Sequence, residues 1–215
     1  MHCDMNNILL LIALSFLSAC ANPPVGKTVL PSVSSSVSSL YTKQDVDEWR
    51  MPLTHGKERI TKKSFGIHVL PENSPVSPER FSGYHTGVDF EILSGEEGMD
   101  VSVVSVCAGA VTFRHWVKGY GGVLIQECAL PNADRVSVLY GHLNINSILL
   151  SVGDTLSVGD RIGLLGEAYS DQTDGERKHL HLSVHIGSAR ELRGYVEKND
   201  ELKEWMDPLP LLLGT

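Results

Sequence analysis

Polar and apolar residues alternate strictly from residue 179 to residue 186, near the C-terminal end of the chain. A period of two is typical of a β-strand with one face in a core. The polar face of this strand carries His179, His181, Ser183 and His185. The opposite face, which we expect in the core, carries Leu180, Leu182, Val184 and Ile186. Because imidazole is a common metal ligand, the polar face indicates either part of a metal site or a solvated strand surface.

Short β-branched and aromatic runs, separated by Gly, Pro, Asn and Asp, predict further strands at 101–106, 110–117, 123–126 and 136–139. The Lys-Gly-Tyr-Gly-Gly stretch at 118–122 is a turn between two of them, and the folded part begins with a strand-like stretch at 59–67. A helical period occurs only at 199–206, where Asp207-Pro208 ends it. The pattern predicts a mainly β domain built on an antiparallel sheet, with a short C-terminal helix.

A small internal repeat lies between these strands and the histidine strand. The sequence Ser-Val-Gly-Asp occurs at 151–154 and again at 157–160. Two such turns in succession predict a tight hairpin that carries Leu156, Ile162 and Leu164 into the core. A similar rhythm occurs in lipoyl and biotinyl carrier domains. Such carriers hold their cofactor on an exposed lysine, and residues 143–176 contain none, which disfavours this alternative.

The N-terminal 46 residues read as export and tethering segments. The apolar run 8–17 is too short to span a bilayer, and the small residues Ser18 and Ala19 precede Cys20. The sequence Leu-Ser-Ala-Cys at 17–20 resembles a bacterial lipobox, which implies a lipidated Cys20 and a firm membrane anchor. A plain secretory signal or a buried helix stays open, because residues 1–7 contain no Lys or Arg. We expect a lipoprotein signal peptide at 1–19, a flexible Ser/Pro-rich tether at 20–46, the folded domain at 47–208 and a tail at 209–215.

The net charge and the cysteines bear on the class of partner and on a possible disulfide. The 215 residues carry a net charge of −8 and no Lys/Arg-rich run, which excludes a nucleic-acid partner. Cys107 and Cys128 fall on strands that we expect to pair, and an exported protein permits a disulfide between them. The two are offset by a few residues, so a disulfide requires a bulge. Two buried thiols are the alternative.

Three further residues carry the chemistry of metal ligands or of bases. His85 and Asp89 stand four apart around Gly87, which lets the backbone bring the two side chains together. Zinc accepts both donor types, and a catalytic zinc keeps three protein ligands and one position for water. One histidine of the 179/181 pair would complete such a set. His142 follows the strand at 136–139 and, taken alone, is equally consistent with a loop histidine bonded to backbone.

In this order the three stretches resemble the lysostaphin-like, or LytM-type, zinc peptidases, which cut peptidoglycan cross-bridges. The family pattern is H-x-x-x-D, then Y-x-H-L, then H-x-H, and it stands here at 85–89, 140–143 and 179–181. The resemblance covers residues 59–187 and implies an antiparallel sheet that forms an open groove. It implies one zinc ion per chain held by His85, Asp89 and His181. It also implies that His142 and His179 are the catalytic pair beside a zinc-activated water.

Two stretches depart from the family pattern. The loop at 171–178 is longer and more charged than the Gly/Ser/Thr/Pro-rich loop of the family, and we expect it to border the cleft. After His181 the family often continues with an aromatic and an acidic residue, whereas this chain has His185, which we expect at the cleft rim. The segment 79–84 either lines the groove or packs in the core through Phe81 and Tyr84.

The resulting hypothesis is a lipid-anchored zinc endopeptidase that hydrolyses the peptide cross-links of bacterial peptidoglycan. Its partners would be the peptide stems, the membrane that Cys20 anchors and a possible protein regulator. Ala21 and Asn22 include no Asp, which in a cell with two membranes favours the cell envelope at the inner face of the outer membrane, facing the periplasm. The bond cut in such a wall would be a D-alanyl to diaminopimelate cross-link. The alternative is a non-catalytic wall-binding lipoprotein that activates another hydrolase; the presence of all five site residues favours the enzyme.

Overall fold

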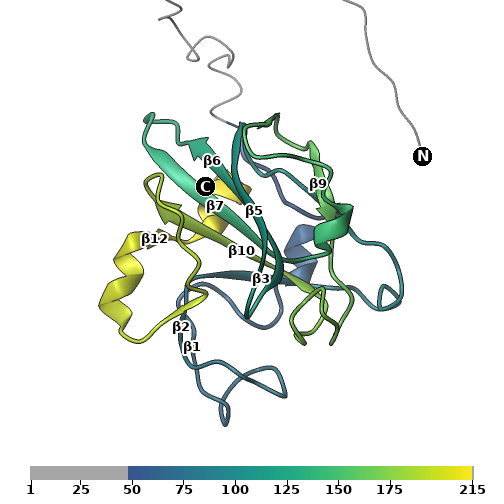
Figure 1. Cartoon of the computed structure of the whole chain (residues 1–215). Coiled ribbons are helices and arrows are strands. Elements are labelled where there is room, and N and C mark those ends of the chain that lie inside the picture. The colour runs from purple at the N-terminus through teal and green to yellow at the C-terminus, as the bar shows by residue number, and fades with distance from the viewer. Residues whose placement is uncertain (1–47, 215) are drawn as a thin grey trace, which may run out of the picture. The chain divides into compact units, whose positions relative to one another are not determined.

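The histidine-bearing stretch forms β10 (His179–Ile186), inside the largest sheet of the protein (Figure 1). The computed structural model describes residues 48–214, so the predicted signal peptide, lipidated Cys20 and tether lie outside the described residues. Along one side β10 pairs with β7 (Arg135–Leu143). Along the other side it pairs first with β3 (Gly87–Glu91) and then with β12 (Trp205–Met206). Every one of these pairings is antiparallel, which confirms the predicted fold class.

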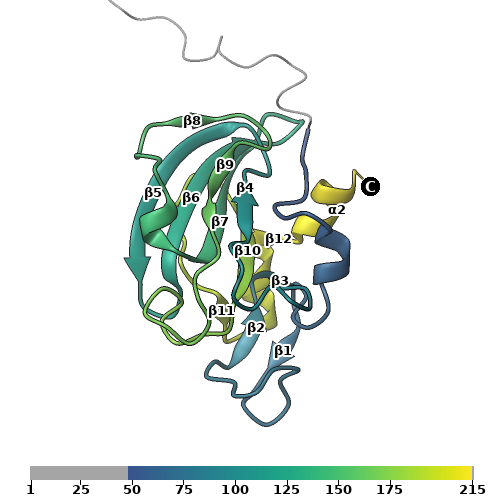
Figure 2. The same cartoon turned by 90° about the vertical axis from the view of Figure 1, so that its right-hand side faces the viewer.

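Beyond β7 the sheet continues through three more strands, which Figure 2 shows side by side with it. They are β6 (Gly121–Ala129), β5 (Gly109–Val117) and the short β8 (Thr155–Leu156). A small sheet contains β1 (His68–Val69), β2 (Gly83–His85) and β11 (Tyr195–Val196). A two-stranded sheet pairs β4 (Ser102–Val104) with β9 (Arg161–Leu164). A 3₁₀ turn, η3 (Ile145–Ser147), follows β7.

The apolar face of β10 lies in the main core, as its alternation predicts. Leu180, Leu182 and Val184 are fully buried and pack with Val88 and Phe90 of β3. Burying each such side chain contributes about 1.5–3 kcal/mol, so this face fixes the register of β10 against its neighbours. The expectation for Ile186 was wrong: this last residue of the strand is 49% exposed.

The strand predicted at 59–67 was also wrong. Gly56–Arg59 forms a 3₁₀ helix, η2, and no residue of 60–67 belongs to a strand. Charged side chains explain the difference, because they turn inwards here. Arg59 is buried and donates to Glu96 at 2.6 Å and to the Thr54 carbonyl at 2.7 Å. Lys63 is buried as well, and the segment is held by such side-chain bonds together with isolated backbone bonds, such as Gly66 N–H to the His85 carbonyl, rather than by a continuous strand ladder.

The Ser-Val-Gly-Asp repeat does not form the predicted hairpin. β8 pairs with β5, and β9 pairs with β4. Each repeat is instead a separate turn, in which Asp154 accepts from the backbone N–H of Ser151, and Asp160 from that of Ser157. Leu156 and Ile162 do reach the core, but Leu164 is half-buried and Leu165 takes the core position.

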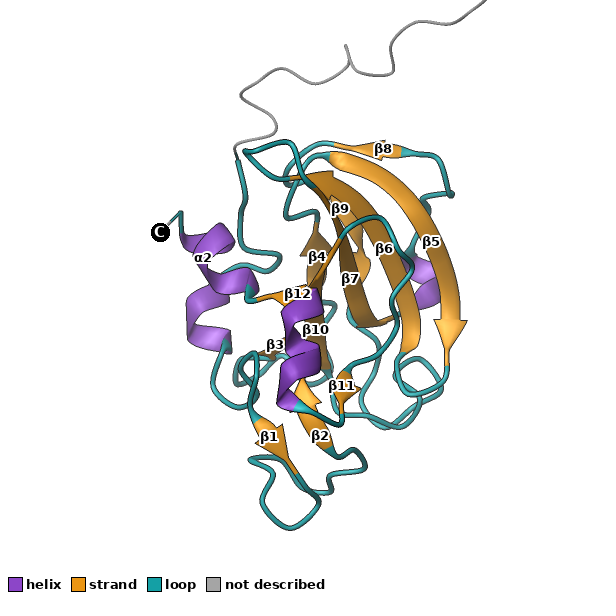
Figure 3. Ribbon diagram, turned by 90° about the vertical axis from the view of Figure 1, so that its left-hand side faces the viewer, coloured by secondary structure: helices purple, strands orange, loops and turns teal. Residues whose placement is uncertain are grey.

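The α-helix predicted at 199–206 was wrong, and the α-helix of this region lies after Asp207, mostly in the segment expected to be a tail. Asn199–Glu204 is a 3₁₀ helix, η4, and the two residues after it join the sheet as β12. The α-helix is α2 (Pro208–Leu213), which Figure 3 shows near the C-terminus. Pro208 begins it and the Asp207 side chain caps it. Proline suits the first helical position because the N–H it lacks has no partner there. Leu212 belongs to the main core, and α2 packs against β3 and β10. Among residues 48–214, no helix has both the length and the apolar character to cross a membrane.

The two candidate cysteines are joined: Cys107 and Cys128 form a disulfide, with their Cα atoms 6.2 Å apart. Gly109 stands opposite Cys128 in the β5–β6 pair, and a register shift follows between Val111 and Phe113. The bulge that the sequence offset requires is therefore present. The bond ties the segment just before β5 to the last part of β6, and both cysteines belong to the main core.

Candidate metal centre

Three donor atoms converge at the junction of β2, β3 and β10. His85 Nε2 lies 2.9 Å from His181 Nδ1 and 3.3 Å from Asp89 Oδ1, and His181 Nδ1 lies 3.2 Å from Asp89 Oδ1. All three side chains are buried. Neighbouring ligands of a tetrahedral zinc with bonds of 2.0–2.1 Å are about 3.3 Å apart. The three residues that the sequence nominated as ligands therefore occupy a triangle of the right size for one zinc ion.

The strand register produces this convergence. Asp89 of β3 stands directly opposite His181 of β10, so the two side chains leave the same face of the sheet. Gly87 matters because of close approach, since a Cβ atom there would lie 2.9 Å from both Cε1 and Nε2 of His181. Gly87 lies within the extended strand β3, so it permits close packing against His181 and does not bend the backbone.

The protonation states suit metal binding. Burial alone would raise the pKa of Asp89, but the neighbouring histidines, first His179 and then His85, hold it well below its usual value, so the carboxylate is ionised. Burial lowers the pKa of His181 to about 4, so its imidazole is neutral. His85 Nδ1 donates to the Ser64 carbonyl at 3.1 Å, which leaves the Nε2 lone pair facing the other two donors. The donor set thus fits a divalent cation with nitrogen and oxygen ligands.

His142 and His179 lie beside this triangle, with ring centroids 4.3 Å apart. His179 Nδ1 donates to the Arg177 carbonyl at 2.9 Å, and its Nε2 lies 3.4 Å from Asp89 Oδ2. Burial, and next the charge of His179, lower the pKa of His142 well below its usual value. Its Nδ1 is buried without a hydrogen-bond partner in the described chain. The structure therefore brings all five predicted site residues together, with two imidazole rings next to the donor triangle.

A local distortion of β7 accompanies the placement of His142. Tyr140 and Leu143 are three residues apart, yet both lie in the main core, so the strand alternation is interrupted between them. His142 has a φ of 59°, in the left-handed region that non-glycine residues rarely adopt. Such backbone costs on the order of 1–3 kcal/mol and concentrates at functional sites. Its ring lies beside that of His179 on β10, at the donor triangle.

A pocket of about 240 Å³ opens over the site and supplies the predicted groove. It is lined by Lys63, Phe81, Asp89, Lys118, Gly119, Tyr120, His142, Glu176, Arg177, His179, His181, Leu192, Gly194 and Tyr195. Glu176 and Arg177 confirm that the 171–178 loop borders the cleft. The 79–84 segment is divided: Phe81 lines the pocket, while Tyr84 packs with Val196 and Trp205.

Tyr120 is a functional candidate that the sequence reasoning did not single out. Its hydroxyl is buried and has no hydrogen-bond partner within residues 48–214. Burial, and next the Asp89 charge, raise its pKa, so it stays a protonated donor. A Cβ atom at Gly141 would lie 2.6 Å from the Tyr120 ring, and one at Gly194 would lie 2.6 Å from its hydroxyl. The glycine in Tyr140-Gly141-His142 was the available signal, because it marks a backbone that another group approaches.

His185 takes no part in this site, so its expected place at the cleft rim was wrong. It does not line the pocket, and its ring meets Trp205 edge-on at 5.1 Å. Glu191 and Glu204 lie near it, and the three residues offer ligand atoms within 4.8 Å of one another. Arg193 already pairs with both carboxylates, at 2.7 Å and 3.1 Å. On the polar face of β10, His179 and His181 therefore belong to the site, whereas His185 lies beside an ion-pair network.

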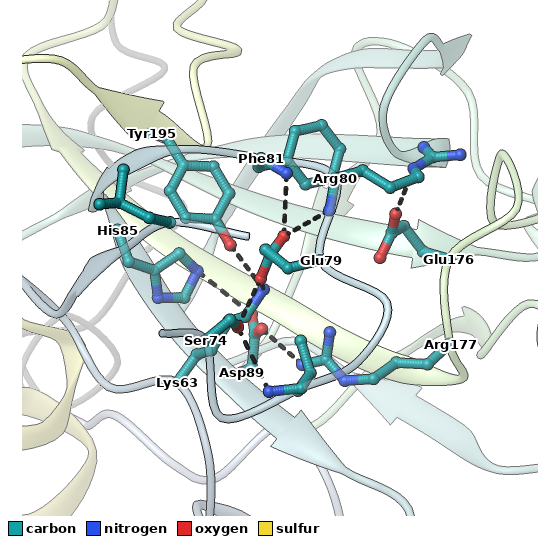
Figure 4. Close-up of polar contacts among 12 residues, drawn as sticks. Lys63, Ser74, Glu79, Arg80, Phe81, His85, Asp89, Glu176, Arg177 and Tyr195 are labelled. Atoms are coloured by element: carbon teal, nitrogen blue, oxygen red, sulfur yellow. Dashed lines mark hydrogen bonds and ion pairs between the residues drawn. The ribbon is translucent and has the colours of Figure 1, made fainter. Parts of the chain in front are cut away.

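A buried ion pair supports one wall of the pocket. Lys63 Nζ lies 2.5 Å from Glu79 and donates to the Tyr195 hydroxyl at 2.9 Å, as Figure 4 shows. The side chains of Lys63 and Glu79 are 2% and 1% exposed. Ser74 also donates to Glu79, at 2.7 Å. Phe81 stacks on Tyr195 with 5.5 Å between the ring centroids. The Lys63–Glu79 ion pair therefore anchors the segment that carries Phe81 into the pocket.

Replacing Glu79 with alanine leaves the Lys63 ammonium buried without its counter-charge. We expect the free energy of unfolding to fall by about 3–5 kcal/mol, measured by urea denaturation at pH 7. Burial would raise the pKa of Glu79, but the hydrogen bonds from Lys63 and Ser74 outweigh it and lower the pKa. The stabilisation is therefore complete above the unfolded pKa of about 4.3 and is lost as pH falls through the folded value. Glu72→Ala, an exposed change on the same segment, is the control, and an equal loss in both variants would contradict the expectation.

Comparisons with known proteins agree with this geometry. The model of the family described as "Peptidase family M23" matches residues 83–192. Endolysin 2638A of Staphylococcus phage 2638A is 31% identical over 121 residues, which are 56% of this chain and only 23% of the endolysin. The catalytic domain of the antimicrobial peptidase lysostaphin from Staphylococcus simulans is 20% identical, with a TM-score of 0.50 over 76% of this chain and 99% of that domain. Cbpa from L. salivarius REN is 22% identical, with a TM-score of 0.52 over 78% of this chain and 96% of its own. The two structural likenesses show the shared fold.

Proposed function

The chain belongs to peptidase family M23, and on this premise we propose that it is a zinc-dependent endopeptidase acting on the peptide cross-links of bacterial peptidoglycan. The observation that carries the proposal is the buried triangle of His85, Asp89 and His181, whose edges of 2.9–3.3 Å suit one zinc ion. The lysostaphin and endolysin relatives support a wall substrate, since their names describe an antimicrobial peptidase and a phage lytic enzyme.

When bound, zinc supplies a Lewis acid and lowers the pKa of a coordinated water towards about 7. The rest of the chemistry belongs to the chain. His179 has its Nδ1 proton committed to the Arg177 carbonyl, so its Nε2 is free to accept a proton from water. His142 and the protonated Tyr120 hydroxyl line the same pocket without partners in the described residues. We assign both as hydrogen-bond donors to the carbonyl oxygen as it gains charge, and the proton that His179 takes from water then passes to the departing amine.

The site is preorganised for this role. His142 is held neutral by burial, and its strained backbone fixes its ring against His179. The disposition of all five predicted residues supports catalysis over the non-catalytic alternative, because an activator has no need of two bases beside three metal donors. We propose further that Cys20 anchors the domain at the periplasmic face of the outer membrane, within reach of the peptide stems, and that a protein regulator acts on it there.

The test is metal content together with muropeptide digestion by the full chain. We expect about one zinc per chain, loss of cross-linked muropeptide dimers, and no loss after chelation and gel filtration. Restored cleavage on adding zinc back separates metal removal from damage. A folded protein that binds no zinc and leaves every cross-link intact would overturn the peptidase and favour the hydrolase-activating lipoprotein.

A further inference from the structure

Arg177 lies in the charged 171–178 loop, where the chain departs from the family pattern, and reaches from there to β3 (Figure 4). We propose that it is a positioning residue, which holds Asp89 in the orientation that the metal requires. The inference rests on the proposed zinc site. The Arg177 side chain is 12% exposed, so its contacts form largely out of solvent. Among residues 48–214 it is the only lysine or arginine paired with Asp89.

The guanidinium of Arg177 spans two carboxylates of β3. Its Nη2 donates at 2.7 Å both to Asp89 Oδ2 and to Glu91 Oε1, and its Nε lies 3.1 Å from each Glu91 oxygen. Asp89 and Glu91 are two residues apart on the strand and therefore share a face. A planar fork of donors fits this arrangement, whereas a lysine ammonium offers only a point charge.

The two oxygens of the Asp89 carboxylate have different partners. Oδ1 faces His85 and His181 in the donor triangle, while Oδ2 faces Arg177. His179 Nε2 is 3.4 Å from the same Oδ2. Without Arg177, Asp89 is free to rotate or to offer both oxygens to the metal. Arg177 thus occupies Oδ2 and leaves Oδ1 for the metal.

The same residue also orients the base. The Arg177 carbonyl accepts the Nδ1 proton of His179 at 2.9 Å, which fixes the tautomer. One loop residue therefore holds a metal ligand through its side chain and a catalytic histidine through its backbone. Two effects oppose each other at the metal, because the guanidinium positions Asp89 but also offsets its negative charge. Groups that orient metal ligands typically contribute 10–100-fold in affinity, so positioning should prevail.

The test measures the zinc affinity of the full chain by competition with a chromogenic chelator. We expect Arg177→Gln to weaken zinc binding about 10–100-fold and to change the visible absorption spectrum of the cobalt-substituted protein. Arg177→Lys should give an intermediate affinity, because an ammonium reaches Asp89 but does not fork to Glu91. Both readouts are independent of cleavage.

The matched control is Arg80→Gln. Arg80 ties the same loop down through Glu176 at 2.7 Å and Asp174 at 3.7 Å but makes no contact with Asp89. Its loss should change zinc affinity by no more than about twofold. Unchanged or tighter zinc binding in Arg177→Gln, or an equal weakening in Arg80→Gln, would overturn the proposal. If Arg177→Gln does not fold, Arg177→Lys decides, and a wild-type affinity and cobalt spectrum in that variant would refute it. A wild-type chain that binds no zinc would overturn the proposed function instead.

Discussion

His179→Ala is expected to keep one zinc per chain and to lower kcat/KM for a cross-linked muropeptide about 10²–10⁴-fold, the usual contribution of a general base. The physical reason is the position of the imidazole. Its ring lines the pocket and its Nε2 is not one of the three converging donors, so its removal takes away a proton acceptor and leaves the triangle intact. Zinc content by mass spectrometry and steady-state kinetics on the same preparation provide the measurement.

The control for this variant stands on the same strand face. His185→Ala removes an imidazole six residues further along β10, beside Trp205 and outside the pocket, and should leave kcat/KM within about twofold of wild type. Loss of zinc from His179→Ala would mean that the roles of His179 and His181 are exchanged or shared. Unchanged kinetics would remove His179 from the mechanism.

The alternating strand at 179–186 was predictable because its signal is local. A period of two fixes which side chains share a face before any partner strand is known, and Leu180 and Leu182 supply the apolar surface that holds it. The partners of that strand are not local information. Asp89 stands opposite His181 because of the pairing register between two strands some ninety residues apart in the chain. The three motifs indicated this pairing only through their resemblance to a family.

Buried charge explains much of what the sequence did not reveal. Charged residues are assigned to the surface by default, because burial without a partner is costly. Lys63 and Arg177 are nevertheless largely buried, since each meets a carboxylate that the fold brings to it, Glu79 for Lys63 and Asp89 for Arg177. The failed strand at 59–67 and the unrecognised role of Arg177 have this common cause.

The orientation of His142 was unpredictable for a different reason. Its motif marked it as a candidate, but its left-handed backbone conformation is strained. Tertiary packing imposes this conformation, and no local propensity favours it. Tyr120 is similar, since its place depends on two glycines from distant parts of the chain, Gly141 and Gly194. The lipid anchor at Cys20 and the outer-membrane location stay predictions, because they concern residues outside 48–214.

His181→Ala should lose the metal itself. The variant removes one corner of the donor triangle, which leaves His85 and Asp89 as a two-ligand remnant. Wild-type protein at a free zinc concentration about 1,000 times the dissociation constant gains about 4 kcal/mol of stability from binding. For a domain of this size that corresponds to a rise in Tm of about 8–16 °C, and His181→Ala should show almost none of it.

Each protein is compared with its own metal-free form, so any stability lost by emptying a buried site cancels from the comparison. Calorimetry with and without zinc gives the two Tm values, and the chelated wild type sets the baseline. We expect no detectable cleavage from His181→Ala even at saturating zinc, in contrast to His179→Ala, which fails with its metal in place. A zinc-dependent Tm rise in His181→Ala equal to that of wild type would show that the ion binds elsewhere. His85, Asp89 and His181 would then not be the zinc ligands.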